Sequence, residues 1–369
     1  MKNDKKLKLA GLAAVVAIAV SACGSASSTK ESVVQDNSSV ETTKGLVIDG
    51  EQVATQDIYD KAKTQTLSLY TGYPEANEKT FLEAFTKDTG IKVNMVRLQP
   101  NRLSERVLSE QGAGVLSADV VRISDYRLAD GFSKAGVWRP YTVPGAEKFN
   151  EAVINKGDFT RTHNAVYSFG YNSQLVKDED APKSWANLVD GKWAGKIGIV
   201  QGNSGGGVAA LNRFMETKLG TDYFSKYAAL KPKIYEGVGP EQTALARGEV
   251  AVGTIAPATV NVAVATEKAP LKVVVPEEGI ISFDYYLGAT AKGANPEAAD
   301  VFMNYNMSKR GQQIFADLGD YAVNPAIAPP TSAGVQLPTI DSGKVWRMSV
   351  EDAKKGDADA AKWKSVFAY

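Results

Sequence analysis

A glycine-rich segment at residues 201–207 carries the clearest chemical signal in the sequence. It includes Asn203, Ser204, Gly205 and Gly206, and it separates a short apolar run from a helical stripe of apolar residues. Glycines leave backbone N–H groups uncovered, and the start of a helix adds unpaired donors and a partial positive charge. The segment therefore suits a phosphate, phosphonate or carboxylate group, with the Ser204 hydroxyl as a further contact. The alternative is a tight turn in which Ser204 only caps the helix.

Polar residues also follow two other expected strands. Tyr73 comes after the strand expected at 66–70. Its ring could stack on a ligand there, or its hydroxyl could hydrogen-bond to one. Ser124, Asp125 and Arg127 come after the strand expected at 118–123. Asp125 suits an amine and Arg127 an oxyanion. The structural alternatives are a rim position for Tyr73 and a helix-capping role for Asp125.

Two adjacent tyrosines, Tyr285 and Tyr286, could bind a hard cation together with Asp284. They lie in an apolar stretch that is typical of a strand, so core tyrosines are the preferred interpretation. The single histidine, His163, stands between polar residues and is expected at the surface. With one histidine and scattered carboxylates, the sequence offers no clear nucleophile–base pair. We therefore do not expect an enzyme.

Composition excludes several other classes of protein. The chain has 369 residues, with 42 basic and 42 acidic side chains, so its net charge is zero. A nucleic-acid binder would need a basic face, and this class is excluded. The single cysteine excludes a disulfide within the chain and cysteine-based zinc sites. The length favours two lobes of about 100–200 residues each.

The N-terminus has the features of an export signal. Four lysines precede an apolar run at residues 9–20, which is too short to cross a bilayer but suits a signal peptide. The run ends just before Cys23, in a pattern that resembles a bacterial lipobox. We expect removal of residues 1–22, lipidation of Cys23 and a flexible tether over the Ser/Thr-rich residues 23–45. A signal peptide with a chance cysteine is the alternative.

Strand and helix patterns alternate along the rest of the chain. They predict strand 66–70, helix 75–88, strand 91–95, a helix capped by Asn101, strand 118–123, strand 196–200, helix 208–219 and strand 248–253. This order predicts parallel, doubly wound sheets, in which ligands bind beyond the carboxyl ends of the strands. The rule adds Thr254 to the candidate site residues. A C-terminal helix with Trp363 and Phe367 on one face is expected to dock on the body.

Six stretches carry a family resemblance: LSLYTGYPEANEKTFLEAFTKDTGIKV (67–93), ADVVRIS (118–124), SFGYNSQLV (168–176), PKSWANLVDGKWAGKIGI (182–199), LARGEVAVG (245–253) and ANPEAADVFMNYNMSKRGQQ (294–313). In this order they resemble the extracellular solute-binding proteins of ABC importers. The branch includes ferric-ion, polyamine, thiamine, phosphonate and sugar-phosphate binders.

The resemblance implies a two-lobed α/β fold of the periplasmic-binding-protein type II. Each lobe would be a doubly wound, mostly parallel sheet, and β-strand hinges would join the lobes and let them close on a ligand. Lobe 1 would comprise residues 46–166 and 287–369, and lobe 2 residues 167–286.

The resemblance also bears on the ligand. Residues 204–206 match the backbone-and-hydroxyl site that holds an oxyanion in family members. Ferric-ion binders of this branch carry a tyrosine pair soon after the strand at 248–253, which this chain lacks, and Ser124 stands where some have a glutamate. The expected solute is a small organic molecule with an oxyanion, such as a phosphonate or a phosphate ester, with an amine near Asp125 or Asp284.

The expected role is to capture this solute and deliver it to a membrane permease at the outer face of the bacterial cell membrane or on its periplasmic side. The expected partners are the solute, an ABC permease and membrane lipid through Cys23, with no nucleic acid and no cofactor. A monomer is expected. The alternatives are a ferric-ion transport protein that uses Tyr285 and Tyr286, a ligand sensor, and a secreted enzyme on the same scaffold.

Overall fold

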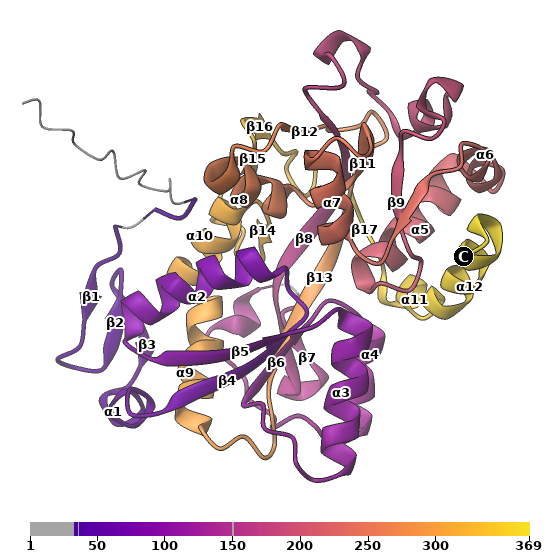
Figure 1. The fold of residues 1–369 in the computed structure, drawn as a ribbon. Helices are drawn as coiled ribbons and strands as arrows, with labels where there is room; N and C mark the ends of the chain where they lie inside the picture. Colours follow the sequence, from indigo (N-terminus) through magenta and orange to yellow (C-terminus); the bar gives the residue numbers. More distant parts are fainter. Residues whose placement is uncertain (1–32, 36, 150) are drawn as a thin grey trace, which may run out of the picture. The chain divides into compact units, whose positions relative to one another are not determined.

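The computed structural model describes residues 33–35, 37–149 and 151–369 (Figure 1). The predicted signal peptide, Cys23 and the first part of the predicted tether lie outside these residues. Among the helices that are described, none is long and apolar enough to cross a membrane.

The described residues of the predicted tether, 33–35 and 37–45, pack against the rest of the folded chain. Val34 is buried in the main hydrophobic core. Strand β1 (Val40–Glu41) pairs with β2 (Leu46–Ile48), which pairs with β3 (Glu51–Ala54), all antiparallel. These contacts fasten the chain from Val34 onward.

Three parallel strands form the first part of the main sheet. β4 (Thr66–Thr71) lies between β5 (Lys92–Arg97) and β6 (Val120–Ile123). Parallel neighbours need a crossover, and helices α2 (Glu75–Thr89) and α3 (Pro100–Gly112) provide the two crossovers. The predicted βαβαβ order is confirmed.

The ends of these helices follow known capping rules, with one correction. Gly90 ends α2 in a left-handed conformation, at φ 73°, as expected for a residue without a Cβ. Helix α3 begins at Pro100, with Gln99 as its cap. The prediction that Asn101 caps this helix was wrong, because a proline fits the first helical position, where its missing N–H costs nothing.

Two long strands continue the sheet. β8 (Phe159–Asn172) and β13 (Ile280–Ala289) pair antiparallel. β13 also pairs antiparallel with β6, and β8 pairs with β11 (Val252–Ile255), so the sheet is mixed (Figure 1). The predicted lobe boundaries, at residues 166/167 and 286/287, lie within these two strands.

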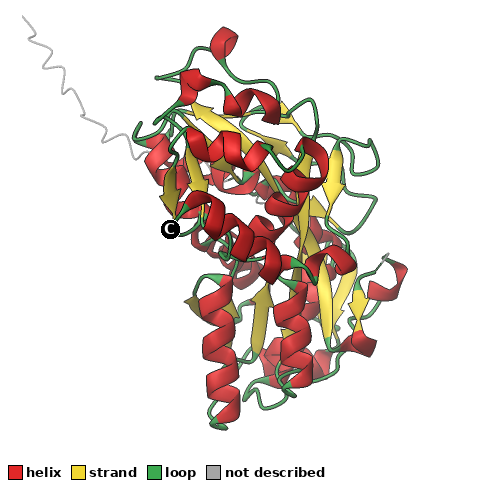
Figure 2. Cartoon of the chain, turned by 90° about the vertical axis from the view of Figure 1, so that its right-hand side faces the viewer, coloured by secondary structure: helices red, strands yellow, loops and turns green. Residues whose placement is uncertain are grey.

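The remaining elements complete the chain. The other strands are β7 (Val153–Ile154), β9 (Gly198–Val200), β10 (Lys233–Tyr235), β12 (Leu271–Val273), β14 (Tyr321–Ala322), β15 (Thr331–Ser332), β16 (Val335–Gln336) and β17 (Val345–Arg347). The other helices are α1 (Gln56–Ala62), α4 (Tyr126–Lys134), α5 (Gly206–Leu219), α6 (Tyr223–Ala229), α7 (Val238–Ala246), α8 (Pro257–Glu267), α9 (Pro296–Met307), α10 (Lys309–Leu318), α11 (Val350–Ala353) and α12 (Gly356–Phe367). Helices α3 and α4 stand in front of the strands in Figure 2.

The C-terminal helix docks through aromatic side chains, as predicted. In α12, Trp363 and Phe367 are buried. Trp363 packs against Phe224 of α6 with ring centroids 5.3 Å apart, and its indole N–H donates to the carbonyl of Val200, 3.1 Å away. The helix therefore packs on elements of the predicted second lobe, residues 167–286, next to α5 and α6 (Figure 1).

Candidate functional site

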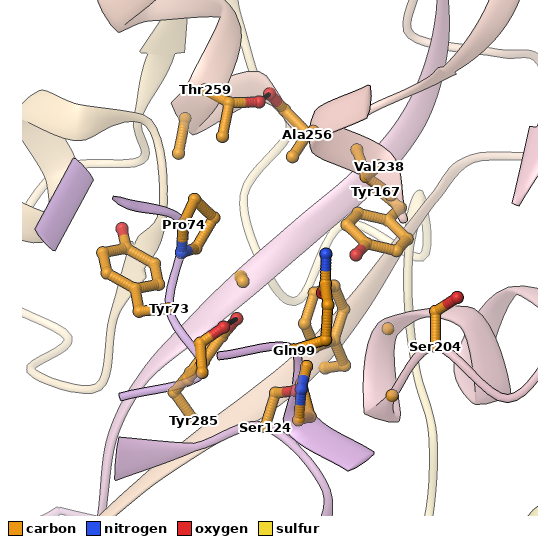
Figure 3. Close-up of a pocket in the computed structure, with 18 of the residues that line it drawn as sticks. Tyr73, Pro74, Gln99, Ser124, Tyr167, Ser204, Val238, Ala256, Thr259 and Tyr285 are labelled. Atoms are coloured by element: carbon orange, nitrogen blue, oxygen red, sulfur yellow. Dashed lines mark hydrogen bonds between the residues drawn. The ribbon is translucent and has the colours of Figure 1, made fainter. Parts of the chain in front are cut away.

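A cavity of about 180 Å³ lies where several segments from distant parts of the chain meet (Figure 3). Tyr73 comes from the segment after β4, Gln99 from the segment after β5, and Ser124 from the segment after β6. Ser204 and Gly205 line the cavity at the start of α5. The structure thus brings together four predicted site residues: Tyr73, Ser124, Ser204 and Gly205.

The glycines before and at the start of α5 allow backbones to approach closely. A Cβ placed on Gly206 would lie 2.0 Å from the carbonyl oxygen of Ser124. Gly205 has φ 137°, and a Cβ there would lie 2.8 Å from Pro100. A Cβ on Gly207 would lie about as close to aromatic rings of the cavity wall. Gly206 therefore contacts Ser124 and does not line the cavity.

Backbone donors at this loop are available, but the serine hydroxyl is not. Ser204 Oγ is 2.7 Å from the carbonyl of Glu236 and 2.9 Å from that of Gln201, so its proton is already shared with the backbone. The N–H groups of the first turn of a helix lack intrahelical partners. Those of residues 205–207 make no hydrogen bond to another residue in the described part of the chain.

Asp125 and Arg127 satisfy each other away from the cavity. Asp125 is buried and caps α4, accepting the backbone N–H of Arg127 at 2.9 Å. Its Oδ2 also lies 2.7 Å from Nη2 of Arg127, which pairs in addition with Asp357. Neither residue lines the cavity. The helix-cap alternative therefore describes Asp125 in the structure.

The two tyrosines of β13 lie on opposite faces of the strand. Tyr285 lines the cavity, whereas Tyr286 faces away and donates to Asp284 Oδ2 at 3.0 Å. Asp284 is held by Arg347, with Nη2 2.7 Å from Oδ2. Both tyrosines are buried core residues, as preferred from the sequence. They are not placed to bind one ion together.

Two other predicted site residues lie outside the cavity wall. Asn203 is exposed. Thr254 is buried in β11, where its backbone N–H donates to Glu241 Oε1 at 2.8 Å. Both flank the cavity in sequence without lining it.

His163 is buried, and the prediction that it lies at the surface was wrong. It sits in β8, and its ring stacks on Phe315 with centroids 3.9 Å apart and on Tyr285 with centroids 4.8 Å apart. Burial lowers its pKa well below the usual value, so the ring is neutral. Its polar neighbours misled the prediction because they too are buried, within the strand.

Arg97 is a site residue that the sequence analysis missed. It ends β5 and lines the cavity. Its Nε donates to the carbonyl of Tyr73 at 3.2 Å, and Nη2 lies 3.5 Å from Gln99 Oε1. It forms no ion pair with any carboxylate of the described chain. The signal was present, because a polar residue at the carboxyl end of a parallel strand faces the ligand edge of the sheet.

Asp320 is the second missed residue. It follows α10, lines the cavity and is almost fully buried. Its Oδ2 accepts a hydrogen bond from the Tyr73 hydroxyl at 2.6 Å and lies 3.7 Å from Nε2 of His163. Burial raises the pKa of Asp320 to about 7. Nothing local in the sequence marks it, because its partners lie far away along the chain.

Aromatic rings form much of the remaining wall. Tyr73, Tyr167, Phe283 and Tyr285 all line the cavity (Figure 3 labels the three tyrosines). Tyr73 and Tyr285 meet edge to face with ring centroids 5.0 Å apart, and Tyr167 meets Phe283 at 4.7 Å. Within the described residues, no group of three or more His, Cys, Asp and Glu side chains is placed to hold a metal. The cavity thus combines aromatic walls with one guanidinium and one buried carboxyl.

The raised pKa of Asp320 predicts a pH-dependent stability of the ligand-free protein. A carboxyl with a higher pKa in the folded than in the unfolded chain stabilises the fold while protonated, and this contribution is lost as the pH rises from about 4 through 7. Between about pH 5 and 8, the Tm of the wild type should therefore fall by several degrees relative to that of Asp320→Asn. Thermal unfolding followed by circular dichroism measures both proteins. The pH-dependent contributions of other buried carboxyls, such as Glu241, are the same in both proteins and cancel in the difference between the two Tm values. A Tm difference that stays constant with pH would contradict the prediction.

Comparison with known proteins decides the family. The model of the bacterial extracellular solute-binding protein family matches residues 115–345. The chain belongs to this family. The match spans β6, both long strands and the glycine-rich loop, so it includes most of the cavity wall.

Named relatives agree with this assignment. The chain is 26% identical over 271 residues to "Spermidine/putrescine-binding periplasmic protein 1" of Haemophilus influenzae, which covers 68% of this chain and 72% of the relative. It is 23% identical over 303 residues to a Salmonella paratyphi A periplasmic protein whose name proposes 2-aminoethylphosphonate as its ligand, covering 77% and 86%. The solved substrate-binding protein of an ABC transporter from Agrobacterium tumefaciens has the same fold, with a TM-score of 0.72 and 19% identity over 84% of this chain and 97% of that one.

These matches confirm the predicted resemblance and the type II periplasmic-binding-protein fold. The protein is the substrate-binding component of an ABC transporter. Members of the family bind small-molecule solutes, work with ABC permeases and act on the periplasmic side of the membrane. These homologues are transport proteins and not enzymes.

Proposed function

We propose that this protein captures a small organic molecule bearing an oxyanion, such as a phosphonate or a phosphate ester, and delivers it to an ABC permease. The observation that carries this proposal is Arg97, a guanidinium on the cavity wall with no carboxylate partner among the described residues. A guanidinium matches the geometry of phosphonate and carboxylate oxygens and binds them through charge-assisted hydrogen bonds.

The glycine-rich loop supports the same ligand class. The backbone N–H groups at the start of α5 favour an anion, because they lack hydrogen-bond partners within the helix and lie at the positive end of the helix dipole. Gly205 and Gly207 line the same cavity as Arg97. The anion is thus expected between Arg97 and this loop. The relative named for 2-aminoethylphosphonate lends further support.

Ferric ion is the second candidate, because three tyrosines of the cavity could bind it in place of the pair Tyr285 and Tyr286 that the sequence analysis considered. Tyr73, Tyr167 and Tyr285 line one cavity with Asp320. Ferric ion is a hard cation that is held by anionic ligands, and within the described residues no group of three or more His, Cys, Asp and Glu side chains is placed to hold a metal. Tyr73 is also engaged with Asp320. The oxyanion is therefore favoured over the ion.

We further propose that the protein is anchored to the membrane by a lipid and that it does not chemically change its solute. Lipidation of Cys23 would hold the protein at the outer face of the membrane as a monomer beside its permease. No catalytic role is proposed for any residue of the cavity, so a bound solute should be recovered unchanged. Release of an altered product would favour the alternative of a secreted enzyme.

The Arg97→Met variant tests this function. We expect it to weaken binding of an alkylphosphonate or phosphate ester roughly 10- to 100-fold, since a hydrogen bond to a charged group contributes about 1.5–3 kcal/mol. Isothermal titration calorimetry of the purified full chain gives the dissociation constants. Arg102→Met is the control, because Arg102 is exposed and its ion pair within the described residues is with Glu105 on its own helix. Binding of ferric citrate alone, with no response to oxyanions, would contradict the proposal.

A further inference from the structure

One buried carboxyl on the cavity wall forms no ion pair with a charged cation among the described residues. Asp320 accepts a hydrogen bond from Tyr73, and the nearest basic side chain, His163, is neutral. The guanidinium of Arg122 is fully buried nearby and acts on Asp320 through its charge, but its ion pair is with Glu78, with Nε 3.2 Å from Oε2. Ionising a buried carboxyl without a partner is costly, so a ligand that supplies a cation would be favoured there.

The surroundings of this carboxyl suit an ammonium group. Tyr73, Tyr167 and Tyr285 line the cavity together with Asp320. The faces of aromatic rings attract cations, and recognition of ammonium groups commonly combines such rings with a carboxylate. The cavity, at about 180 Å³, is also small, since pockets for drug-sized ligands measure about 300–1,000 Å³. The ligand therefore has few atoms.

The two carboxylates first considered for an amine are already neutralised. Asp125 is paired with Arg127, and Asp284 is paired with Arg347. Among the acidic residues that line the cavity, Glu75 is exposed and paired with Lys79 at 2.5 Å. This leaves Asp320 for an amine.

We propose that Asp320 is a specificity-determining residue that binds a protonated amine, so that the solute is a small zwitterion with its oxyanion at Arg97. The inference rests on the proposed function, because it presumes an oxyanion at the other end of the cavity. To the proposed function it adds that the ligand is a zwitterion and that Asp320 selects for its amine.

The proposal has a consequence for proton linkage. The groups that face Asp320 are Tyr73 after β4, Arg122 on β6, His163 and Tyr167 on β8, and Tyr285 on β13. Burial raises the pKa of the three phenols and lowers that of His163, so neither the phenols nor the imidazole titrates near neutral pH. An ammonium favours ionised Asp320, so the zwitterion should bind with release of a proton and more tightly as the pH rises from about 6 to 8.

Three probes separate the two ends of the ligand. 2-Aminoethylphosphonate carries both groups, ethylphosphonate carries only the oxyanion, and putrescine carries only amines. Titration calorimetry of the full chain at pH 6, 7 and 8, in buffers of different ionisation enthalpy, gives both affinity and proton release. For the wild type, 2-aminoethylphosphonate is expected to bind at least tenfold more tightly than ethylphosphonate at pH 8. At pH 6, where Asp320 of the free protein is mostly protonated, the binding of 2-aminoethylphosphonate is also expected to release more protons than the binding of ethylphosphonate.

The Asp320→Asn variant should lose this preference and the proton release while keeping its affinity for ethylphosphonate. Asparagine still accepts the hydrogen bond of Tyr73, and Asp341→Asn, at an exposed position, is the matched control. Equal affinity of the wild type for both phosphonates would overturn the inference and leave the proposed function standing. If neither phosphonate binds, the proposed function itself fails. Binding of putrescine alone would overturn the zwitterion, and the wild-type comparison remains decisive even if the variant does not fold.

Discussion

Replacing Glu78 by glutamine should destabilise the fold by about 3–5 kcal/mol, because it leaves a buried guanidinium without its counter-ion. Glu78 and Arg122 are both fully buried, with Nε 3.2 Å from Oε2. The same Oε2 accepts the hydroxyl of Thr71 at 2.6 Å. Removal of one charge is costly because the other stays buried without a counter-ion, whereas the intact pair need not add to stability.

The surroundings of the pair explain why Arg122 cannot relax. Its guanidinium carbon lies 5.2 Å from the ring centroid of Phe81 and 5.3 Å from that of Phe315. Nη2 donates to Asn306 Oδ1 at 2.7 Å. The backbone carbonyl of Arg122 also accepts the N–H of Gly72, at 2.8 Å, in the loop that leads into the cavity. The variant should therefore also disturb the loop that carries Tyr73.

Urea denaturation at constant m-value measures the loss of stability. Glu105→Gln is the control, since its exposed pair with Arg102 should contribute less than about 1 kcal/mol. The double variant Glu78→Met, Arg122→Met removes both charges and should recover most of the stability. A Glu78→Gln effect as small as that of Glu105→Gln would show that the buried charge is compensated in another way.

The place of the site could be predicted from the sequence because it depends on topology. The carboxyl ends of parallel strands meet at one edge of a sheet, so the loops after β4, β5 and β6 had to converge. Tyr73 and Ser124 were found in this way. Arg97 was missed because the predicted second strand ended at Met95, two residues too early.

The partners of charged side chains could not be predicted, because they depend on distant parts of the chain. Asp284 is neutralised by Arg347, which follows it by 63 positions. Asp320 meets Tyr73 across 247 positions. No local pattern predicts such contacts. Asp125 is the exception: its partner is two residues away, and the capping alternative was visible in the sequence.

The mixed character of the sheet also escaped local patterns. β8 contains Thr160, Thr162 and Asn164, so its polar side chains concealed a strand that is buried at every position except Tyr167. Two of these side chains find partners inside the protein, since Thr162 Oγ1 lies 3.0 Å from Nδ1 of His163 and Asn164 donates to Asp284. A strand buried on both faces is usually apolar throughout, and this one departs from the rule next to the site.

Replacing Gly206 by alanine should weaken ligand binding roughly 100-fold, although the residue need not touch the ligand. Gly206 begins α5, where alanine is intrinsically favoured over glycine by about 1 kcal/mol. Its added methyl group would nevertheless lie 2.0 Å from the carbonyl oxygen of Ser124. Binding needs the loop before α5 and the segment after β6 to face one ligand, and the methyl group would hold them apart.

Calorimetric affinities of Gly206→Ala and Gly131→Ala test this argument. Gly131 lies in helix α4, and nothing stands within 4 Å of a Cβ added there, so the control should bind like the wild type. Unchanged affinity of Gly206→Ala would mean that the approach of the two backbones is not required for binding. A loss of affinity confined to Gly206→Ala separates the steric effect from the helix propensity that the two substitutions share. The close approach of Gly206 to the Ser124 backbone beside the cavity, and not a contact with the solute, would then set the affinity at this position.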